Sequence, residues 1–210
     1  MKMREGDIET WNRKDAFRFF FDFEDPYFSI TADVDATDAY HLSKGSGLPF
    51  SLVTLHSALK AANSIREFRM RFLGGKLIEF ETVNGSQVVM HEDETFSFCF
   101  YDYFEDLGTF INAGLSAQEA VRNSKKLDEN PDRYDQIYFS VIPWVSFSSF
   151  KNAQRRDESM TVPRIVFGKF REHEGRMLIP VAVEVNHSMM DGLHVGRFFE
   201  RLEEIFRNLK

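Results

Sequence analysis

The segment Val185–Gly192 carries the residue types best suited to chemistry in this sequence. His187 follows an apolar run, and Asp191 comes four residues later, directly before Gly192. A strand end gives a histidine a rigid backbone while its ring projects into a cleft, and a neutral imidazole can take a proton from a hydroxyl or a thiol. Asp191 would then open a helix, where its carboxylate faces free backbone N–H groups. A structural histidine followed by a simple helix cap shows the same pattern, and this alternative stays open.

Two further segments contain groups that could act with the first. In the segment 142–150, three serines that end with Ser149 are interleaved with phenylalanines. A serine hydroxyl in such a dry aromatic setting can donate a hydrogen bond to a developing oxyanion. Near the N-terminus, Arg13 follows Trp11 and Asn12, and a guanidinium can pair bidentately with a buried carboxylate. Both segments also have plainer interpretations, with serines that satisfy backbone groups at a turn and an arginine that is a solvated charge.

A metal centre is not expected. His187, Asp191 and His194 are the best candidate ligands, but a four-residue gap across a strand–helix junction does not stack side chains on one metal ion. Cys99 is the single cysteine, so neither an intrachain disulfide nor a multi-thiolate site can form. A reducing cytoplasm is the compartment that this cysteine usage favours.

The elements that must position these residues follow from hydrophobic periodicity. Alternating or continuous apolar runs predict strands, and apolar residues at three- and four-residue spacing predict helices. Strands are expected at Tyr27–Val34, Lys76–Glu81, Gln87–His91, Thr95–Tyr103 and Tyr138–Pro143, with a hairpin formed by Arg164–Phe170 and Met177–Val185. Helices are expected at Asn12–Phe23, Pro49–Ile65, Asp106–Leu127 and Gly192–Leu209. This pattern predicts the α/β class, as an α+β layered sandwich in which helices cover a mixed sheet. No repeat or linker interrupts the chain, so residues 1–210 form one predicted domain.

Composition excludes several classes of protein. The 210 residues contain 26 Lys plus Arg and 33 Asp plus Glu, a net charge of −7, which argues against nucleic acid as a partner. No secretory h-region opens the chain, and no stretch approaches the roughly 20 apolar residues that span a bilayer. The 23 phenylalanines suit a well-packed globule that also buries a subunit interface.

The three segments, taken in this order, resemble the trimeric chloramphenicol acetyltransferases. His187–Gly192 is similar to the HxxxDG signature of that family, and Leu193–Arg197 is similar to the FHVGR that follows it. Pro143–Phe150 resembles the PWVxFxSF segment, and Trp11–Phe17 resembles the WxRR start. The resemblance runs from about Trp11 to Leu209 and implies the fold of the CoA-dependent acyltransferases.

The resemblance also implies a role for each site residue. His187 would be the general base that deprotonates the hydroxyl of chloramphenicol or of a related small molecule, which then attacks the thioester of acetyl-CoA directly. Ser149 would hydrogen-bond the oxyanion of the tetrahedral intermediate. Asp191 and Arg13 would form a structural ion pair that supports the site. The family is a homotrimer with interfacial active sites, and acetyl-CoA is its co-substrate.

The acceptor pocket is where this sequence departs from the family pattern. The candidate pocket residues are Phe20, which stands where the family has a tyrosine, Glu24 and Phe28. Val166 replaces a threonine, and the loop Lys151–Thr161 is highly charged where the family loop is more apolar. These differences predict an altered pocket.

Two alternatives remain. One is the catalytic core of a dihydrolipoyl acyltransferase, which shares HxxxDG, although no lipoyl module or Pro/Ala-rich linker precedes the core here. The other is a trimeric small-molecule binder that has lost turnover. Retention of His187, Ser149, Asp191 and Arg13 argues against a pure binder.

Overall fold

The computed structural model describes residues 2–124, 126–127, 133–154 and 157–209. The helices are α1 (Lys14–Phe20), α2 (Thr37–Ser46), α3 (Phe50–Asn63), α4 (Leu107–Ser124) and α5 (Gly192–Arg207), with 3-10 turns η1 (Arg66–Arg69) and η2 (Glu158–Thr161). The strands are β1 (Met3–Gly6), β2 (Tyr27–Asp35), β3 (Met70–Leu73), β4 (Lys76–Phe80), β5 (Asn84–Met90), β6 (Phe96–Tyr101), β7 (Gln136–Val141), β8 (Arg164–Phe167), β9 (Arg171–His173) and β10 (Arg176–Asn186).

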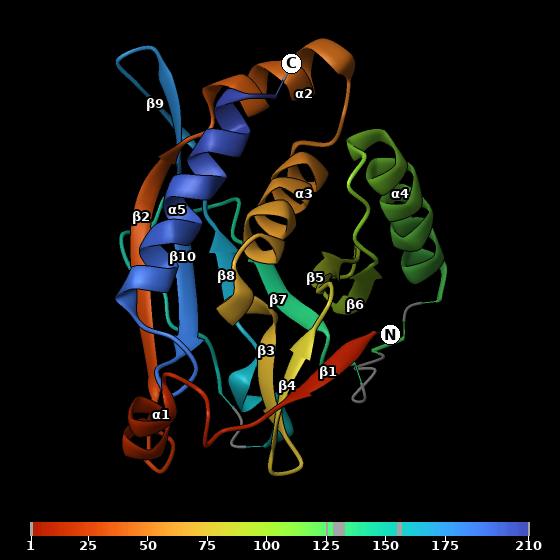
Figure 1. Cartoon of the computed structure of the whole chain (residues 1–210). Coiled ribbons are helices and arrows are strands. Elements are labelled where there is room, and N and C mark those ends of the chain that lie inside the picture. Colours follow the sequence, from red (N-terminus) through yellow and green to blue (C-terminus); the bar gives the residue numbers. More distant parts are fainter. Residues whose placement is uncertain (1, 125, 128–132, 155–156, 210) are drawn as a thin grey trace.

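The main sheet is mixed and has the strand order β2-β10-β8-β7-β5-β6, with β9 paired to the start of β10. The pairs β5–β7 and β7–β8 are parallel, and the other neighbours are antiparallel. A separate antiparallel sheet, β1-β4-β3, stands below α3 in Figure 1. The α/β class with a mixed sheet covered by helices is therefore confirmed.

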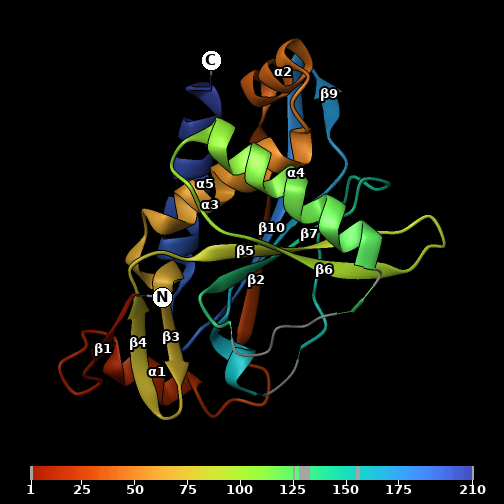
Figure 2. The same ribbon diagram turned by 90° about the vertical axis from the view of Figure 1, so that its right-hand side faces the viewer.

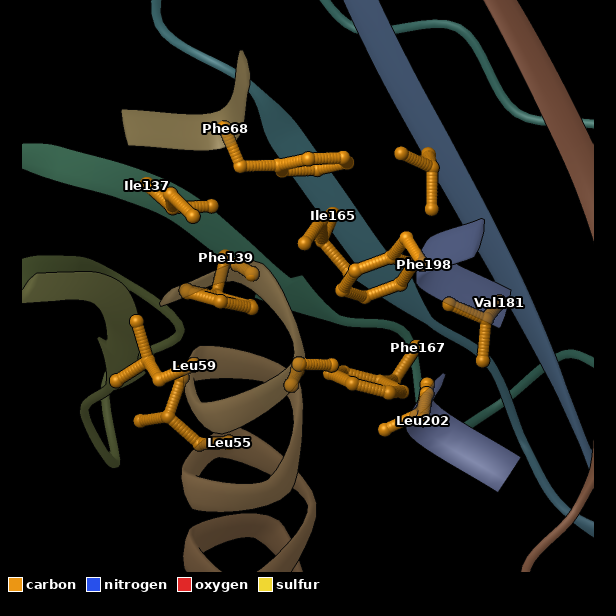
Figure 3. Close-up of a cluster of buried hydrophobic side chains, with 14 of the residues drawn as sticks. Leu55, Leu59, Phe68, Ile137, Phe139, Ile165, Phe167, Val181, Phe198 and Leu202 are labelled. Carbon is orange, nitrogen blue, oxygen red and sulfur yellow. The ribbon is translucent and has the colours of Figure 1, made fainter. Parts of the chain in front are cut away.

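One face of the main sheet is covered by helices, and we call it the helix face. Figures 1 and 2 show α3 and α5 against this face, with α4 over β6. Val185 of β10 pairs with Phe28 of β2, and cross-strand partners point to the same face. Figure 3 shows how α3, η1, β7, β8, β10 and α5 all contribute to this core; its labelled members are Leu55, Leu59, Phe68, Ile137, Phe139, Ile165, Phe167, Val181, Phe198 and Leu202.

The opposite face, which we call the outer face, is covered by the chain that follows β7. The backbone N–H of Lys169 donates to the carbonyl of Val145, and the hydroxyl of Ser29 donates to the carbonyl of Phe150. Glu184 points to this face because its cross-strand partner is Ser29. The segment 145–154 therefore runs over β2 and β10 on the side away from the helices.

A second, smaller core ties the N-terminal segment to the turn after β10. It consists of Trp11, Phe17, Met70, Leu77 and Met189. Burying Trp11 and Phe17 against Met189 brings the start of α1 next to the start of α5, although these parts lie far apart in sequence. This packing is what allows an N-terminal arginine to reach the candidate site.

Several elements were not predicted from the sequence, and the local composition or length of each explains why. Helix α2 contains Gly45, His41 and several short polar side chains, so it lacks the apolar stripe that marks a helix. Strands β1 and β3 have four residues each, too few to show a period. The expected helix at Asn12–Phe23 is shorter, Lys14–Phe20. The expected pairing of Arg164–Phe170 with Met177–Val185 is confirmed in β8 and β10, with β9 placed between them in the chain.

Candidate active site

His187 stands where β10 ends, as predicted. Its backbone N–H donates to the carbonyl of Pro26 at 2.7 Å, which extends the β2–β10 ladder by one bond. Its half-buried ring is stacked on Phe20, with centroids 3.9 Å apart and planes 8° apart, and is tilted against Phe28 at 4.7 Å. Two elements, α1 and β2, thus hold the imidazole in one orientation.

The hydrogen bonding of His187 decides which ring nitrogen is free. Nδ1 lies 3.2 Å from the carbonyl oxygen of Met190. A carbonyl oxygen only accepts, so Nδ1 carries the proton in this bond. Nε2 then keeps its lone pair, and this is the arrangement that a general base needs.

Arg13 and Asp191 form the predicted ion pair. Arg13 Nη1 donates to Asp191 Oδ2 at 2.5 Å, and Arg13 Nη2 donates to the carbonyl of His187 at 3.3 Å. The side chain of Arg13 is 11% exposed and that of Asp191 38%. Burial raises the pKa of the Asp191 carboxyl, but the hydrogen bond and charge of Arg13 outweigh burial, so this pKa lies below its ordinary value of 3.8. The pair therefore fixes the backbone on both sides of the turn 187–191.

Of the two rings that contact the imidazole of His187, Phe20 has the shorter centroid distance. Replacing Phe20 tests what this stacking contributes to activity. In a Phe20→Leu variant we expect kcat/KM to fall about 2- to 10-fold, because an aromatic stacking pair is typically worth about 0.5–1.5 kcal/mol beyond its buried area. Steady-state kinetics would measure this loss. Phe23 touches Phe19 and Phe20 and makes no ring contact with His187, so Phe23→Leu is the matched control, and an equal loss there would contradict the role of Phe20.

Ser149 is not brought to His187 within one chain. Its neighbours place it over the outer face, since the carbonyl of Phe150 is bound by Ser29 and the ring of Phe147 packs close to Gly168. The ring of His187 instead contacts Phe28, whose side chain packs against the core of the helix face. The two predicted catalytic side chains of one chain thus belong to opposite faces of the sheet.

The close packing at Gly168 gives a stability prediction for the segment that carries Ser149. A Cβ at this position would lie 2.6 Å from Cγ of Pro180 and 2.9 Å from Cε1 of Phe147. Overpacking of this kind typically costs about 1–3 kcal/mol, so Gly168→Ala should lower the free energy of unfolding by that amount in urea titrations. Gly196→Ala, where the added methyl meets no atom within 4 Å, is the control and should be neutral or stabilising. A fully stable Gly168→Ala would show that the segment is free to move away.

The charged loop after Ser149 is partly paired with the sheet. Lys151 Nζ lies 2.5 Å from Asp25 Oδ2. Asn152 and Gln154 donate to the buried carboxylate of Glu184, whose pKa is raised by burial. Glu24 is exposed, at the rim of a hollow of about 240 Å³ that also involves Lys151 and Asn152.

The three candidate pocket residues therefore differ in whether they contact the ring of His187. Phe20 and Phe28 contact the ring of His187, and Glu24 lies at the surface beside Asp25. Val166 is buried in β8 opposite Ala182 and points to the outer face. In the single chain the carboxylate of Glu24 is exposed and therefore stays hydrated.

Glu184 is the site-related residue that sequence reasoning missed. The run Met177–Val185 is apolar except for this one carboxylate, which was the available signal. A lone charge within a buried strand requires hydrogen-bond partners, and its partners are the side chains of the loop after Ser149.

Among residues 2–124, 126–127, 133–154 and 157–209, no three histidine, cysteine or acidic side chains lie together as a metal ion would require. None of the helices in these residues has the length and the apolar composition needed to cross a bilayer.

Comparison with solved structures defines the class of protein. A solved chloramphenicol acetyltransferase superposes with a TM-score of 0.88 at 29% identity, covering 98% of this chain and 100% of that one. The dihydrolipoamide acetyltransferase of Azotobacter vinelandii superposes with a TM-score of 0.70 at 16% identity, covering 93% of this chain and 86% of that one. The second likeness shows the fold alone. The fold is that of an acyltransferase.

Sequence comparison identifies the family. The family model described as chloramphenicol acetyltransferase matches residues 1–203. The chloramphenicol acetyltransferase of Clostridium perfringens is 32% identical over 99% of this chain and 96% of that protein. The chain belongs to the chloramphenicol acetyltransferase family.

Proposed function

We propose that this protein transfers the acetyl group of acetyl-CoA to a hydroxyl of chloramphenicol, with His187 as the general base. The observation that carries the proposal is the hydrogen bond from His187 Nδ1 to Met190, which leaves Nε2 free to accept the hydroxyl proton. Family membership supplies the substrates, since the matched relatives carry the name chloramphenicol acetyltransferase.

The proposed reaction is a direct transfer. Nε2 of His187 takes the hydroxyl proton while the oxygen attacks the thioester carbonyl carbon. The carbon–sulfur bond then breaks, the sulfur of CoA leaves, and the imidazolium returns its proton to that sulfur. Ser149 would donate a hydrogen bond to the oxyanion of the intermediate, a contribution typically worth about 2.7–4 kcal/mol.

We also propose that the active enzyme is a homotrimer whose sites combine two chains. Ser149 and His187 of one chain lie on opposite faces, so a site that uses both needs Ser149 from a neighbour. Large apolar side chains are exposed in the single chain, with Trp144 at 66% after β7 and Phe96 at 45% at the start of β6, and a second copy would bury them. Light scattering should give about three times the 24.5 kDa mass of the chain, and a monomer would overturn this proposal.

Release of the CoA thiol tests the chemistry. Wild-type protein should release it from acetyl-CoA only when chloramphenicol is present, and His187→Ala should slow the release by about 100-fold or more. A chloramphenicol-sensitive host that expresses the wild-type chain should also tolerate a higher drug concentration than one that expresses His187→Ala. No release with chloramphenicol would overturn the substrate, and release by His187→Ala at the wild-type rate would overturn the base.

Mixing two inactive variants tests the shared site. His187→Ala and Ser149→Ala subunits, co-expressed in equal amounts, should regain about a quarter of wild-type activity, because each mixed trimer has one interface with both side chains intact. If both residues acted from the same chain, no mixture would regain activity.

A further inference from the structure

His187 and His194 bind the two ends of the same peptide group. Nδ1 of His187 lies 3.2 Å from the carbonyl oxygen of Met190, and the backbone N–H of Asp191 donates to Nδ1 of His194 at 3.1 Å. The carbonyl of Met190 and the N–H of Asp191 belong to one planar unit. A single amide therefore connects the two imidazoles.

The position of each proton along this connection follows from the hydrogen-bonding groups. A backbone N–H only donates, so Nδ1 of His194 is an acceptor and the ring proton of His194 sits on Nε2. That nitrogen lies 3.5 Å from Oε1 of Glu67, which comes from η1. The residue His194 is 7% exposed, and the side chain of Glu67 is 20% exposed, so bulk water screens this contact little.

The resulting chain runs in one direction. It starts at Nε2 of His187, passes through Nδ1–H to the Met190–Asp191 amide, continues through His194, and ends at the carboxylate of Glu67. Aligned hydrogen bonds polarise one another in a low-dielectric interior. A positive charge that develops on His187 would strengthen these two hydrogen bonds in turn, and the negative charge of Glu67 lies 3.5 Å beyond Nε2 of His194.

We propose that His194 and Glu67 are positioning residues for the acetyl transfer: they orient and polarise the amide that holds the imidazole of His187. This inference rests on the proposed function of His187 as the base. In this role Glu67 acts on His187 as an adjacent carboxylate acts on a base histidine, but through one amide and a second imidazole.

A simple helix cap would not need this arrangement. The side chain three residues after a helix N-cap commonly accepts the N-cap N–H, and glutamate or glutamine is the usual residue there. A histidine at this position adds a second nitrogen that reaches another element, η1. Nδ1 of His194 also lies 2.9 Å from Oδ1 of Asp191, so a proton on Nδ1 would turn the ring toward that carboxylate and release the amide. Glu67 favours the proton on Nε2 and so keeps the amide bound.

Kinetics separate positioning from folding. We expect His194→Ala to lower kcat about 10- to 100-fold with KM for both substrates within about 3-fold, and Glu67→Gln to lower kcat about 3- to 10-fold. His194→Gln, which can still accept the Asp191 N–H, should recover most of the loss. Because Glu67 acts through His194, adding Glu67→Gln to His194→Ala should cost nothing further.

Two variants on α5 are matched controls. Leu202 is fully buried on the same helix, so Leu202→Ala lowers the melting temperature without removing the hydrogen bonds of His187 and His194 or the contact with Glu67. Glu204→Gln repeats the charge change of Glu67→Gln at an exposed site. Both should keep wild-type kcat. A loss of kcat in Leu202→Ala equal to that in His194→Ala would overturn the proposal, because it would assign the effect to helix stability.

A spectroscopic readout keeps this inference separate from the proposed reaction. In protein labelled with ¹⁵N-histidine, the wild-type His187 signals should show the proton on Nδ1, and His194→Ala should show a mixture of the two tautomers. If the wild type released no CoA with chloramphenicol, the proposed function would fail. The tautomer of His187 would still test the role of His194, because its measurement does not depend on turnover. An unchanged His187 tautomer in His194→Ala would overturn it.

Discussion

Replacing His187 by alanine lowers kcat for acetyl transfer to chloramphenicol by about 10²- to 10⁴-fold, the range in which a positioned general base contributes. The free Nε2 is the group that would take the hydroxyl proton, since Nδ1 is committed to Met190. KM for both substrates should stay within about 3-fold, because the base makes its main interaction in the transition state. Initial rates of thiol release at saturating substrate measure the loss.

The control is a histidine that lies away from the site. His173 is exposed on β9, so His173→Ala should keep wild-type kcat and KM. His187→Ala removes a ring that is only half-buried, and its melting temperature should therefore stay near that of the wild type. A variant at His187 that folds and turns over at the wild-type rate would contradict the assignment of the base.

Replacing Asp191 by asparagine lowers both stability and kcat. Arg13 would remain with its charge largely buried and no carboxylate to balance it. Breaking a buried pair in this way typically costs about 3–5 kcal/mol, and the partial exposure of Asp191 reduces our expectation to about 2–3 kcal/mol. We expect kcat to fall about 10-fold or more, because Arg13 also binds the carbonyl of His187. Urea unfolding and steady-state kinetics measure the two effects.

Removing both charges provides the decisive comparison. In Arg13→Met combined with Asp191→Asn no charge is stranded, so this double variant should be more stable than the sum of the two single losses indicates. Strict additivity would contradict the ion pair as the source of the stability.

The dependence of stability on pH follows from the lowered pKa of Asp191. Because the pKa in the folded protein lies below the ordinary 3.8, the folded state keeps the carboxylate ionised where the unfolded state takes up a proton. The stabilisation that the Arg13–Asp191 pair provides is fully present above pH 3.8. It is lost as the pH falls through the lower pKa that Asp191 has in the folded protein. The stability difference between wild type and Asp191→Asn should therefore shrink in strong acid and be constant near neutrality.

The parts of the fold that the sequence predicted are those with strong local patterns. The run Met177–Val185 and the helix from Gly192 have a clear period and a clear break between them, and β10 and α5 lie where these patterns indicated. Helix α2 and strands β1 and β3 were missed because they are short or polar and depend on tertiary packing for their stability.

The candidate site likewise combines one feature that the sequence predicted with one that it did not. The family motifs indicated the Arg13–Asp191 pair, and the small core around Trp11 explains how residues 178 positions apart meet. The motifs did not indicate that Ser149 lies over the face opposite His187. The spacing of a motif shows only which residues are near in sequence. The face of the sheet that a loop covers depends on which strands the loop crosses in the folded chain.

By itself, then, the sequence determined which groups are available to this protein: a histidine, a serine, an arginine and an aspartate, in segments that resemble those of the chloramphenicol acetyltransferases, on a layered α/β fold. Only the tertiary structure decided which nitrogen of His187 is free, and it also connected that ring through one amide to His194 and Glu67. The physical reason is that residue types specify which groups can donate or accept, while the direction of each hydrogen bond depends on backbone groups whose positions exist only in the folded chain.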